Sequence, residues 1–414
     1  MTWRPRPRPD WLLEIVDFGD RAPGAAASLV ALDADELAET ACAAANLDDF
    51  GDDAFRARLD TLVTALNDEA RLHLAGRLLA RSEILRFLEN RLLLTRYWHD
   101  NPQATDTRID APVFVTGMGR SGTSILHELL WTDPRNRAPL TWEMLYPVAS
   151  RATTEARADR RAALGNATSR FFGVLAPEFD TMHDSSGYLP NECIFITAVE
   201  FASDYFGGQY NVPSYQMAMA SEDLVTVYAA HKRFLQVLGH GEPERRWVLK
   251  APSHLRMLPA LFAVYPDARV VVTHRDPLQV MASVVSLIGT LQWMRSDSVD
   301  MEAFGMQLAG GFKLILDLVD QWRADGTVPA GQVIDVSYSD LVGEPEATMS
   351  SLYDALGWEF GRNDAARIAD HLGARPKDRH GTHAYSFDDT GLDRDEVRAW
   401  YTEYQERHDV PNEV

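Results

Sequence analysis

The stretch VFVTGMGRSGTSILHELL, residues 113–130, has the pattern of a strand, a glycine-rich turn and a helix in succession. Residues 112–116 form a short apolar run with β-branched side chains between a proline and a glycine, which is typical of a buried parallel strand. We expect the helix over residues 121–131. A turn of this kind directs backbone N–H groups and the positive end of a helix at one point. The stretch therefore predicts an anion site, most often one for phosphate.

The rest of the chain supplies further strands of the same kind. Apolar, β-branched runs predict strands over residues 246–250, 268–274 and 332–337, and helical periodicity predicts helices over 255–264 and 344–356. Strands that alternate with helices imply a parallel sheet with right-handed crossovers. We therefore predict an α/β fold, a P-loop-like parallel sheet flanked by helices.

The region before residue 109 differs in composition and in hydrophobic pattern. It is rich in Ala, Leu, Arg and Glu from Asp33 to about Trp98, with apolar residues at helical spacing, which predicts about three amphipathic helices. Arg4 to Pro9 alternate arginine with proline and should form an extended arm. The expected divisions are an all-helical N-terminal region at residues 1–108, the α/β core at 109–385 and a C-terminal helical segment at 386–414.

Composition excludes several classes of function. The 414 residues include 40 Lys and Arg against 61 Asp and Glu, a net charge of −21. A surface this acidic argues against nucleic-acid partners and against docking on anionic lipid. The two cysteines, Cys42 and Cys193, allow neither a disulfide framework nor a four-thiolate zinc site.

The sequence also predicts where the protein resides. No apolar run of about 18 residues predicts a transmembrane helix, and the start of the chain lacks the apolar core of a secretory signal. We expect a cytoplasmic protein with no membrane span, and the sequence leaves open a homodimer.

The glycine-rich turn fits a dinucleotide site only in part. Gly117, Gly119 and Gly122 match G-x-G-x-x-G, but that fingerprint also needs an acidic residue about 20 residues later, at the end of a second strand. Glu143 lies near that distance, yet residues 139–147 have a proline at each end and lack the pattern of a buried strand. An NAD site is therefore disfavoured.

A triphosphate loop fits no better. Gly117 and Gly122 have the G-x-x-x-x-G spacing, but Thr123 stands where such a loop needs lysine. Without that lysine the β- and γ-phosphate charge is poorly matched, so use of ATP is disfavoured.

The turn GMGRSGTS, residues 117–124, resembles the 5′-phosphosulfate loop of the sulfotransferase family, in which Lys or Arg precedes Ser-Gly-Thr-(Thr/Ser). The resemblance implies 3′-phosphoadenosine 5′-phosphosulfate (PAPS) as sulfuryl donor and no metal. Arg120 would bind the phosphosulfate with its planar fork of donors, and Thr123 and Ser124 would add hydroxyl and backbone donors. The loop residues implied to bind the cofactor are Gly119, Arg120, Ser121, Gly122, Thr123 and Ser124.

A second motif resembles the family's 3′-phosphate site. The strand over 268–274 runs into Arg275, and Ser283 follows eight residues later; in the family, an Arg and a Ser at this spacing hold the 3′-phosphate. Tyr338 begins a Tyr-x-Asp-Leu segment that resembles the one whose tyrosine lies near the adenine. The competing interpretations are a surface ion pair for Arg275 and core packing for Tyr338.

The family also implies catalytic candidates. A strand that ends in lysine, here Lys250, precedes the catalytic histidine of cytosolic members by two residues, but that position is Pro252 and the histidine comes at His254. Together with Arg120, Lys250 would stabilise charge on the oxygen between phosphorus and sulfur as the bond breaks.

The general base has three candidates. Family members with arginine in the first loop, such as tyrosylprotein sulfotransferases, have a catalytic glutamate a little over twenty residues later, and Glu143 lies at that distance from Arg120. In a partly dry cleft the pKa of a carboxylate rises, which makes it a better base. His254 and Glu192 are the alternatives.

The C-terminal part and the acceptor are marked less clearly. The basic cluster at 375–381 loosely resembles the segment that closes over the 3′-phosphate, and His380 and His383 lack a third ligand for a metal. Aromatic and methionine residues in 171–220 and 287–312 could line an apolar pocket or form plain core. We expect a small, lipophilic hydroxyl acceptor; the alternatives are an NAD- or ATP-dependent enzyme and a non-catalytic nucleotide-binding protein.

Overall fold

The computed structural model describes residues 3–149, 158–375, 381 and 383–414. Its sheet has five strands in the order β2-β3-β1-β4-β5, and every neighbouring pair is parallel. This confirms the predicted α/β fold. The strands are β1 (Val113–Gly117), β2 (Asn136–Arg137), β3 (Arg246–Lys250), β4 (Arg269–His274) and β5 (Val333–Ser337).

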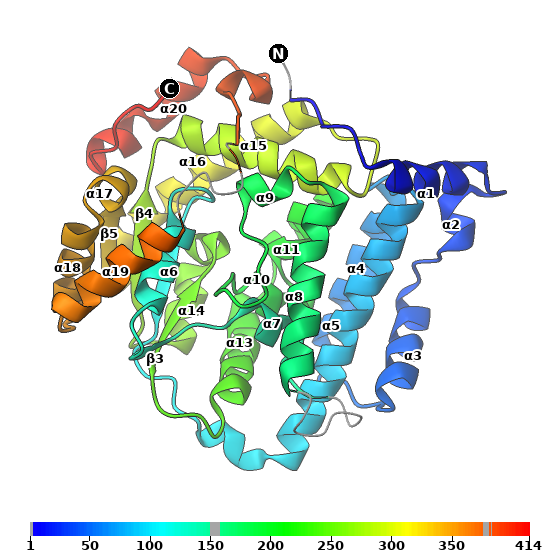
Figure 1. Cartoon of the computed structure of the whole chain (residues 1–414), viewed down its shortest axis with the longest axis horizontal. Coiled ribbons are helices and arrows are strands. Elements are labelled where there is room, and N and C mark those ends of the chain that lie inside the picture. The colour runs from blue at the N-terminus through cyan, green and yellow to red at the C-terminus, as the bar shows by residue number, and fades with distance from the viewer. Residues whose placement is uncertain (1–2, 150–157, 376–380, 382) are drawn as a thin grey trace.

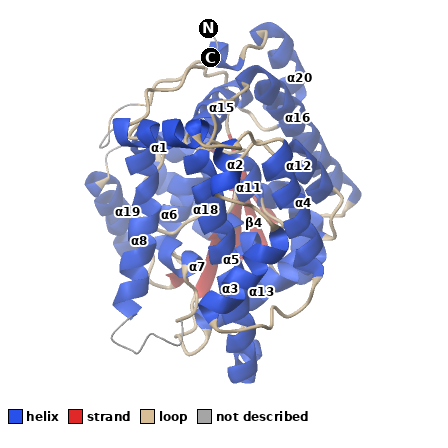
Figure 2. Ribbon diagram, turned by 90° about the vertical axis from the view of Figure 1, so that its right-hand side faces the viewer, coloured by secondary structure: helices blue, strands red, loops and turns tan. Residues whose placement is uncertain are grey.

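The central strand β1 is buried on both faces. Val113 and Val115 face one core together with Leu126 of helix α6 (Thr123–Trp131), whereas Phe114 faces the other core, 5.2 Å from the ring of Tyr265. Successive side chains of a strand point to opposite faces, and a parallel sheet must be covered on both. Helices accordingly hide most of the strands in Figure 2.

The crossover helices follow their strands as expected. The helix after β3 begins as a 3₁₀ turn, η4 (Pro252–Met257), and continues as α14. The helices that follow β3, β4 and β5 are α14 (Leu258–Val264), α15 (Pro277–Trp293), α17 (Tyr338–Gly343) and α18 (Pro345–Leu356).

Most of the remaining helices have no counterpart among the predictions. Those between β2 and β3 are α7 (Thr141–Leu145), α8 (Ala158–Leu175), α9 (Phe179–Met182), α10 (Ile194–Thr197), α11 (Asp204–Gln209), α12 (Pro213–Ala220) and α13 (Leu224–Gly239). After α15 come α16 (Met301–Asp325) and, beyond α18, α19 (Arg362–Ala374) and α20 (Arg394–Arg407), the last in the expected C-terminal helical segment.

The N-terminal region is all-helical, as predicted, and lies to one side of the sheet in Figure 1. A buried ion pair, Glu83 with Arg295 at 2.9 Å, joins its longest helix to the chain just after α15. Residues 4–9 are not helical, as expected of the arm. The three helices predicted from Asp33 to about Trp98 are observed as α3 (Ala34–Ala45), α4 (Ala54–Asp68) and α5 (Leu74–Asp100). Two helices before them were not predicted, α1 (Asp10–Arg21) and α2 (Ala25–Leu29). The proposed domain boundaries stay a prediction.

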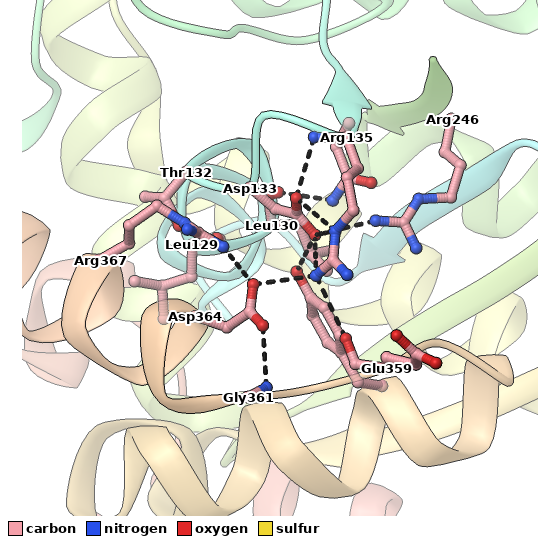
Figure 3. Close-up of polar contacts among 12 residues, drawn as sticks. Leu129, Leu130, Thr132, Asp133, Arg135, Arg246, Glu359, Gly361, Asp364 and Arg367 are labelled. Atoms are coloured by element: carbon pink, nitrogen blue, oxygen red, sulfur yellow. Dashed lines mark hydrogen bonds and ion pairs between the residues drawn. The ribbon is translucent and has the colours of Figure 1, made fainter. Parts of the chain in front are cut away.

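A buried carboxylate fastens the β2–β3 edge of the sheet to the C-terminal helices (Figure 3). Asp133 is 1% exposed and accepts hydrogen bonds from Arg135 Nε at 2.8 Å and Arg246 Nη2 at 2.8 Å. Tyr353 of α18 donates its hydroxyl to the same carboxylate, and Arg135 also pairs with Asp364 of α19. Two helices are thereby held against the edge strand by charge as well as by apolar packing.

Among the described residues, no helix combines the length and the apolar character needed to cross a membrane.

Candidate active site

A cavity of about 790 Å³ lies where the chain leaves the carboxyl ends of β1, β3, β4 and β5. Ligands of open α/β sheets bind at this edge because the loops that follow parallel strands meet there. The lining residues that the sequence predicts as cofactor ligands are Gly119, Arg120, Gly122, Thr123, Ser124, Arg275 and Tyr338.

The loop after β1 requires its glycines. Gly117 has a φ of +145°, and a Cβ there would lie 2.5 Å from Thr273 Oγ1. Gly122 has a φ of +96°, and a Cβ there would lie 2.7 Å from Cδ2 of Tyr338. Only glycine fits either position. The loop therefore lies tightly against β4 and against the ring of Tyr338, and α6 begins directly after Gly122.

Ser121 closes the loop from within. Its hydroxyl donates to Met118 O at 2.5 Å and contacts Thr273 Oγ1 at 2.7 Å, and the residue is fully buried. Its backbone N–H also bonds Met118 O. The predicted contact of Ser121 with a cofactor is untested, but its side chain is committed to the fold of the loop.

The two phosphate motifs meet in space. Arg120 Nε donates to Ser283 Oγ at 3.0 Å, and Arg275 Nη1 donates to the carbonyl oxygen of Arg120 at 3.0 Å. The guanidinium of Arg275 also lies 4.0 Å from the centroid of the Tyr338 ring. Arg120 has a φ of +70°, a left-handed conformation that costs about 1–2 kcal/mol in a residue with a Cβ and is common at functional sites. Arg120, Arg275, Ser283 and Tyr338 thus form one cluster.

Lys250 and Glu192 form an ion pair beside the loop. Lys250, only 1% exposed, donates from Nζ to Glu192 Oε1 at 2.9 Å and to Ser124 Oγ at 3.2 Å. The backbone N–H of Cys193 bonds Lys250 O at 2.7 Å, which holds the segment containing Glu192 at the end of β3. Glu192 lines the cavity, so one carboxylate reaches the site of the predicted anion.

Glu143 lies elsewhere. It stands in the first turn of α7, where its carboxylate accepts hydrogen bonds from Arg137 at 2.5 and 2.9 Å and from the N–H of Leu140 at 2.8 Å. It lines a separate cavity of about 470 Å³. Glu143 is paired with Arg137 and does not line the cavity that contains Arg120. This arrangement favours Glu192 over Glu143 as the base.

His254 is also held away from the cavity. It is 2% exposed, its Nδ1 lies 2.6 Å from the hydroxyl of Tyr228, and its ring packs 4.9 Å from that of Phe114. Burial holds the pKa of His254 well below its usual range, so the ring stays neutral. Its neighbour Ser253 lines the cavity instead.

One histidine of the cavity was not among the predicted site residues. His183 lines it, and burial, followed by the charge of Lys250, lowers the pKa of His183 to about 4. The imidazole is therefore neutral at physiological pH. It belongs to no spacing motif, so no local signal marks it in the sequence.

Much of the remaining lining of the cavity is apolar, although polar residues such as Asn191, Asp204 and Gln216 also contribute to it. Of the aromatic residues singled out in the sequence, Phe172, Tyr205 and Phe304 line it, whereas others such as Phe201 and Phe206 are fully buried core. Further apolar lining residues are Phe179, Ile194, Phe195, Val284, Leu287, Ile288, Leu291, Leu308 and Phe312.

The C-terminal basic cluster is described only in part. Arg375 lines the cavity and pairs with Glu128 of α6 at 2.7 Å. Residues 376–380, including His380, lie outside the described residues. His383 contacts Ser286 Oγ through Nε2 at 2.8 Å.

Two histidines and an aspartate gather away from the cavity, at His274, Asp335 and His408. The rings of His274 and His408 stack 4.1 Å apart and nearly parallel, so their in-plane lone pairs do not converge on one point. Asp335 is already paired with Arg323 at 2.7 Å. The cluster is explained by ion pairing and stacking.

Comparison with known proteins gives a consistent result. The profile described as "Sulfotransferase family" matches residues 112–362. Omega-hydroxy-beta-dihydromenaquinone-9 sulfotransferase Stf3 of Mycobacterium bovis is 26% identical over 268 residues, which are 60% of this chain and 63% of that protein. The same figures hold for Stf3 of Mycobacterium tuberculosis. The match therefore spans less than two thirds of these curated relatives.

Solved structures match over more of the chain. Sulfotransferase STF1 from Mycobacterium tuberculosis superposes with a TM-score of 0.77 at 30% identity, covering 89% of this chain and 98% of that one. Sulfotransferase STF9 from Mycobacterium avium gives a TM-score of 0.81 at 25% identity, covering 92% and 98%.

Proposed function

The chain belongs to the sulfotransferase family, and from this premise we propose that it transfers the sulfuryl group of PAPS to a hydroxyl of a small, lipophilic acceptor. One observation carries the proposal: Arg120, Arg275 and Glu192 line one cavity. The buried Ser283 and Lys250 stand directly behind them, hydrogen-bonded to Arg120 and Glu192.

The proposed nucleotide position follows from the donors. The first turn of α6 leaves backbone N–H groups without helical partners, and with Arg120 they suit the 5′-phosphosulfate. Arg275 and Ser283 suit the 3′-phosphate, and the ring of Tyr338 suits the adenine end. Thr123 in place of a lysine leaves the loop with less positive charge than a triphosphate requires.

PAPS would supply the sulfuryl group: its bond from sulfur to the bridging oxygen breaks as the bond from sulfur to the acceptor oxygen forms, leaving adenosine 3′,5′-bisphosphate. Arg120 and Lys250 would donate hydrogen bonds towards the bridging oxygen, where negative charge builds. Lys250 would thereby release Glu192, whose carboxylate would accept the proton of the acceptor hydroxyl.

The lining of the cavity supports a lipophilic acceptor. Aromatic and aliphatic side chains of α8, α15 and α16 line the cavity together with Glu192, and such a surface binds an apolar molecule by excluding water. The relative Stf3 is named for a hydroxylated menaquinone, itself a lipophilic alcohol. We therefore extend the proposal to alcohols carried on an apolar body.

A transfer assay tests the proposal. Labelled PAPS is incubated with the protein and a panel of long-chain alcohols, phenols and sterols, while calorimetry compares binding of adenosine 3′,5′-bisphosphate, NAD and ATP. We expect label in at least one lipophilic alcohol and tight binding of the bisphosphate alone. Tight binding of NAD or ATP without binding of the bisphosphate would refute the proposal.

A further inference from the structure

The guanidinium of Arg275, to which the proposed function assigns the 3′-phosphate, is already paired with a carboxylate. Arg275 Nε and Nη2 donate to the two oxygens of Glu413 at 2.8 and 2.7 Å. Its third nitrogen, Nη1, donates to the carbonyl oxygen of Arg120. The side chain of Arg275 is 10% exposed and that of Glu413 is 29% exposed, so the pair has a buried arginine and a carboxylate that water can reach. All of the nitrogens of the fork are therefore occupied.

The segment that carries Glu413 is fixed independently of that side chain. The backbone N–H groups of Glu413 and Val414 donate to Asp276 Oδ2 at 2.7 and 3.3 Å. Asp276 is fully buried, caps the start of α15 through Leu278 N–H, and also accepts from Arg398 of α20. The C-terminal mark lies beside α20 in Figure 1. Removing the charge of Glu413 leaves these anchors in place.

We propose that Glu413 is a residue of the nucleotide site that lowers its affinity: its carboxylate occupies Arg275 until a 3′-phosphate displaces it. The proposal rests on the proposed function, because it assumes that Arg275 binds the 3′-phosphate. A carboxylate and a phosphate engage an arginine fork through the same paired N–H donors. The Nε–Nη2 edge of Arg275 can bind either the carboxylate or the phosphate, but not both. A dianionic phosphate binds an arginine more strongly than a carboxylate does.

The exchange has two consequences. The free energy of binding the 3′-phosphate is partly offset by the loss of the Glu413 pair, so the bisphosphate product binds less tightly and leaves faster. A nucleotide without a 3′-phosphate, such as AMP, displaces nothing from Arg275. Glu413 therefore weakens binding of the bisphosphate and leaves binding of AMP unchanged.

Calorimetry on the full chain tests the exchange with adenosine 3′,5′-bisphosphate and AMP as probes. The variants are Glu413→Gln and Glu413→Ala, with Glu406→Gln as a charge-matched control, since Glu406 is an exposed acid of α20. We expect the Kd of the bisphosphate to fall about tenfold in both Glu413 variants, which is about 1.4 kcal/mol. The Kd of AMP should change less than twofold, and Glu406→Gln should behave like the wild type.

An unchanged or weaker bisphosphate affinity in both Glu413 variants would overturn the exchange. An equal gain in affinity for AMP would also overturn it. Such a gain would show that removing a negative charge favours any nucleotide, and not that Glu413 competes for Arg275. If the wild type and every variant fail to bind the bisphosphate, the proposed function fails as well.

Discussion

At the scale of single residues, two glutamates that look alike in the sequence have different surroundings. Glu143 is enclosed by Arg137 and the N–H of Leu140, an arrangement that uses its charge to hold α7. Glu192 faces the cavity with one lysine as partner. Sequence spacing alone favoured Glu143, because the distance along the chain from Arg120 carries no information about which cavity a side chain enters.

Glu192→Gln should reduce the rate of sulfuryl transfer. The amide cannot accept the proton of the hydroxyl, and general-base catalysis typically contributes about 10²- to 10⁴-fold. We expect kcat to fall at least about a hundredfold at saturating PAPS. The Kd of adenosine 3′,5′-bisphosphate should stay within about twofold, since the proposed phosphate ligands remain.

Glu143→Gln is the matched control. It should keep kcat and lower stability by about 2–3 kcal/mol, because breaking a buried ion pair leaves the largely buried Arg137 unpaired. Thermal unfolding and the transfer assay measure the two effects. A loss of kcat in Glu143→Gln with none in Glu192→Gln would reverse our assignment of the base.

At the scale of elements, local pattern was sufficient for the buried strands and insufficient elsewhere. The predicted strand at 268–274 is observed as Arg269–His274, because a continuous apolar, β-branched run is typical of a parallel strand covered on both faces. The two-residue strand β2 has no such run: Asn136 and Arg137 pair with β3 through backbone geometry that tertiary packing sets. Helix α16 was missed for the same reason, since few of its residues are buried.

The residues around the cavity also divide into those that a sequence motif marks and those that only the fold brings together. Arg120, Arg275 and Ser283, which the structure brings together, were marked in the sequence because each belongs to a motif of fixed spacing next to a strand end. His183 and Glu413 reach the cavity and its rim from segments with no motif, so only the folded chain reveals them.

The β2–β3 edge depends on one carboxylate. Asp133→Asn should destabilise the protein by about 2 kcal/mol, because Arg246 loses its charged partner and Arg135 keeps only Asp364, while both arginines stay partly exposed and reach water. Urea unfolding measures the change. Tyr353→Phe removes only the neutral hydrogen bond to Asp133 and should cost about 1 kcal/mol. An Asp133→Asn variant as stable as the wild type would show that the charge of Asp133 does not hold the C-terminal helices against this edge.

At the scale of the whole molecule, an acidic protein is proposed to bind a highly charged anion. The net charge of −21 is spread over the chain, whereas Arg120, Lys250 and Arg275 are gathered at one edge of the sheet. At moderate salt, surface charges are screened over about 10 Å, so the distant acids matter less to a bound anion than these three cations and their partners Glu192 and Glu413. The parallel topology is what gathers them, because β1, β3 and β4 end at the same edge.

Buried histidines should make the whole fold sensitive to acid. Burial lowers the pKa of His127 to about 4 and that of His231 to about 3, from the usual 6.5. Between these values the unfolded chain binds more protons than the folded one, so the free energy of unfolding falls as the pH falls from 6.5 towards 4. Each residue should contribute about 2 kcal/mol between pH 7.5 and 5.

Urea unfolding at both pH values measures this loss. His231→Phe removes one titrating group and should make the difference between the two pH values about 2 kcal/mol smaller, whatever its effect on stability at pH 7.5. An unchanged pH dependence in that variant would contradict the assignment of a neutral, buried His231.

The central claim is that two distant segments hold opposite ends of one nucleotide. A crystal structure of the protein grown with adenosine 3′,5′-bisphosphate tests it most directly. We predict the 5′-phosphate on the loop between Met118 and Ser124, and the 3′-phosphate within hydrogen-bond distance of Arg275 and Ser283. A nucleotide bound away from both arginines, for example in the cavity beside Glu143, would contradict the account.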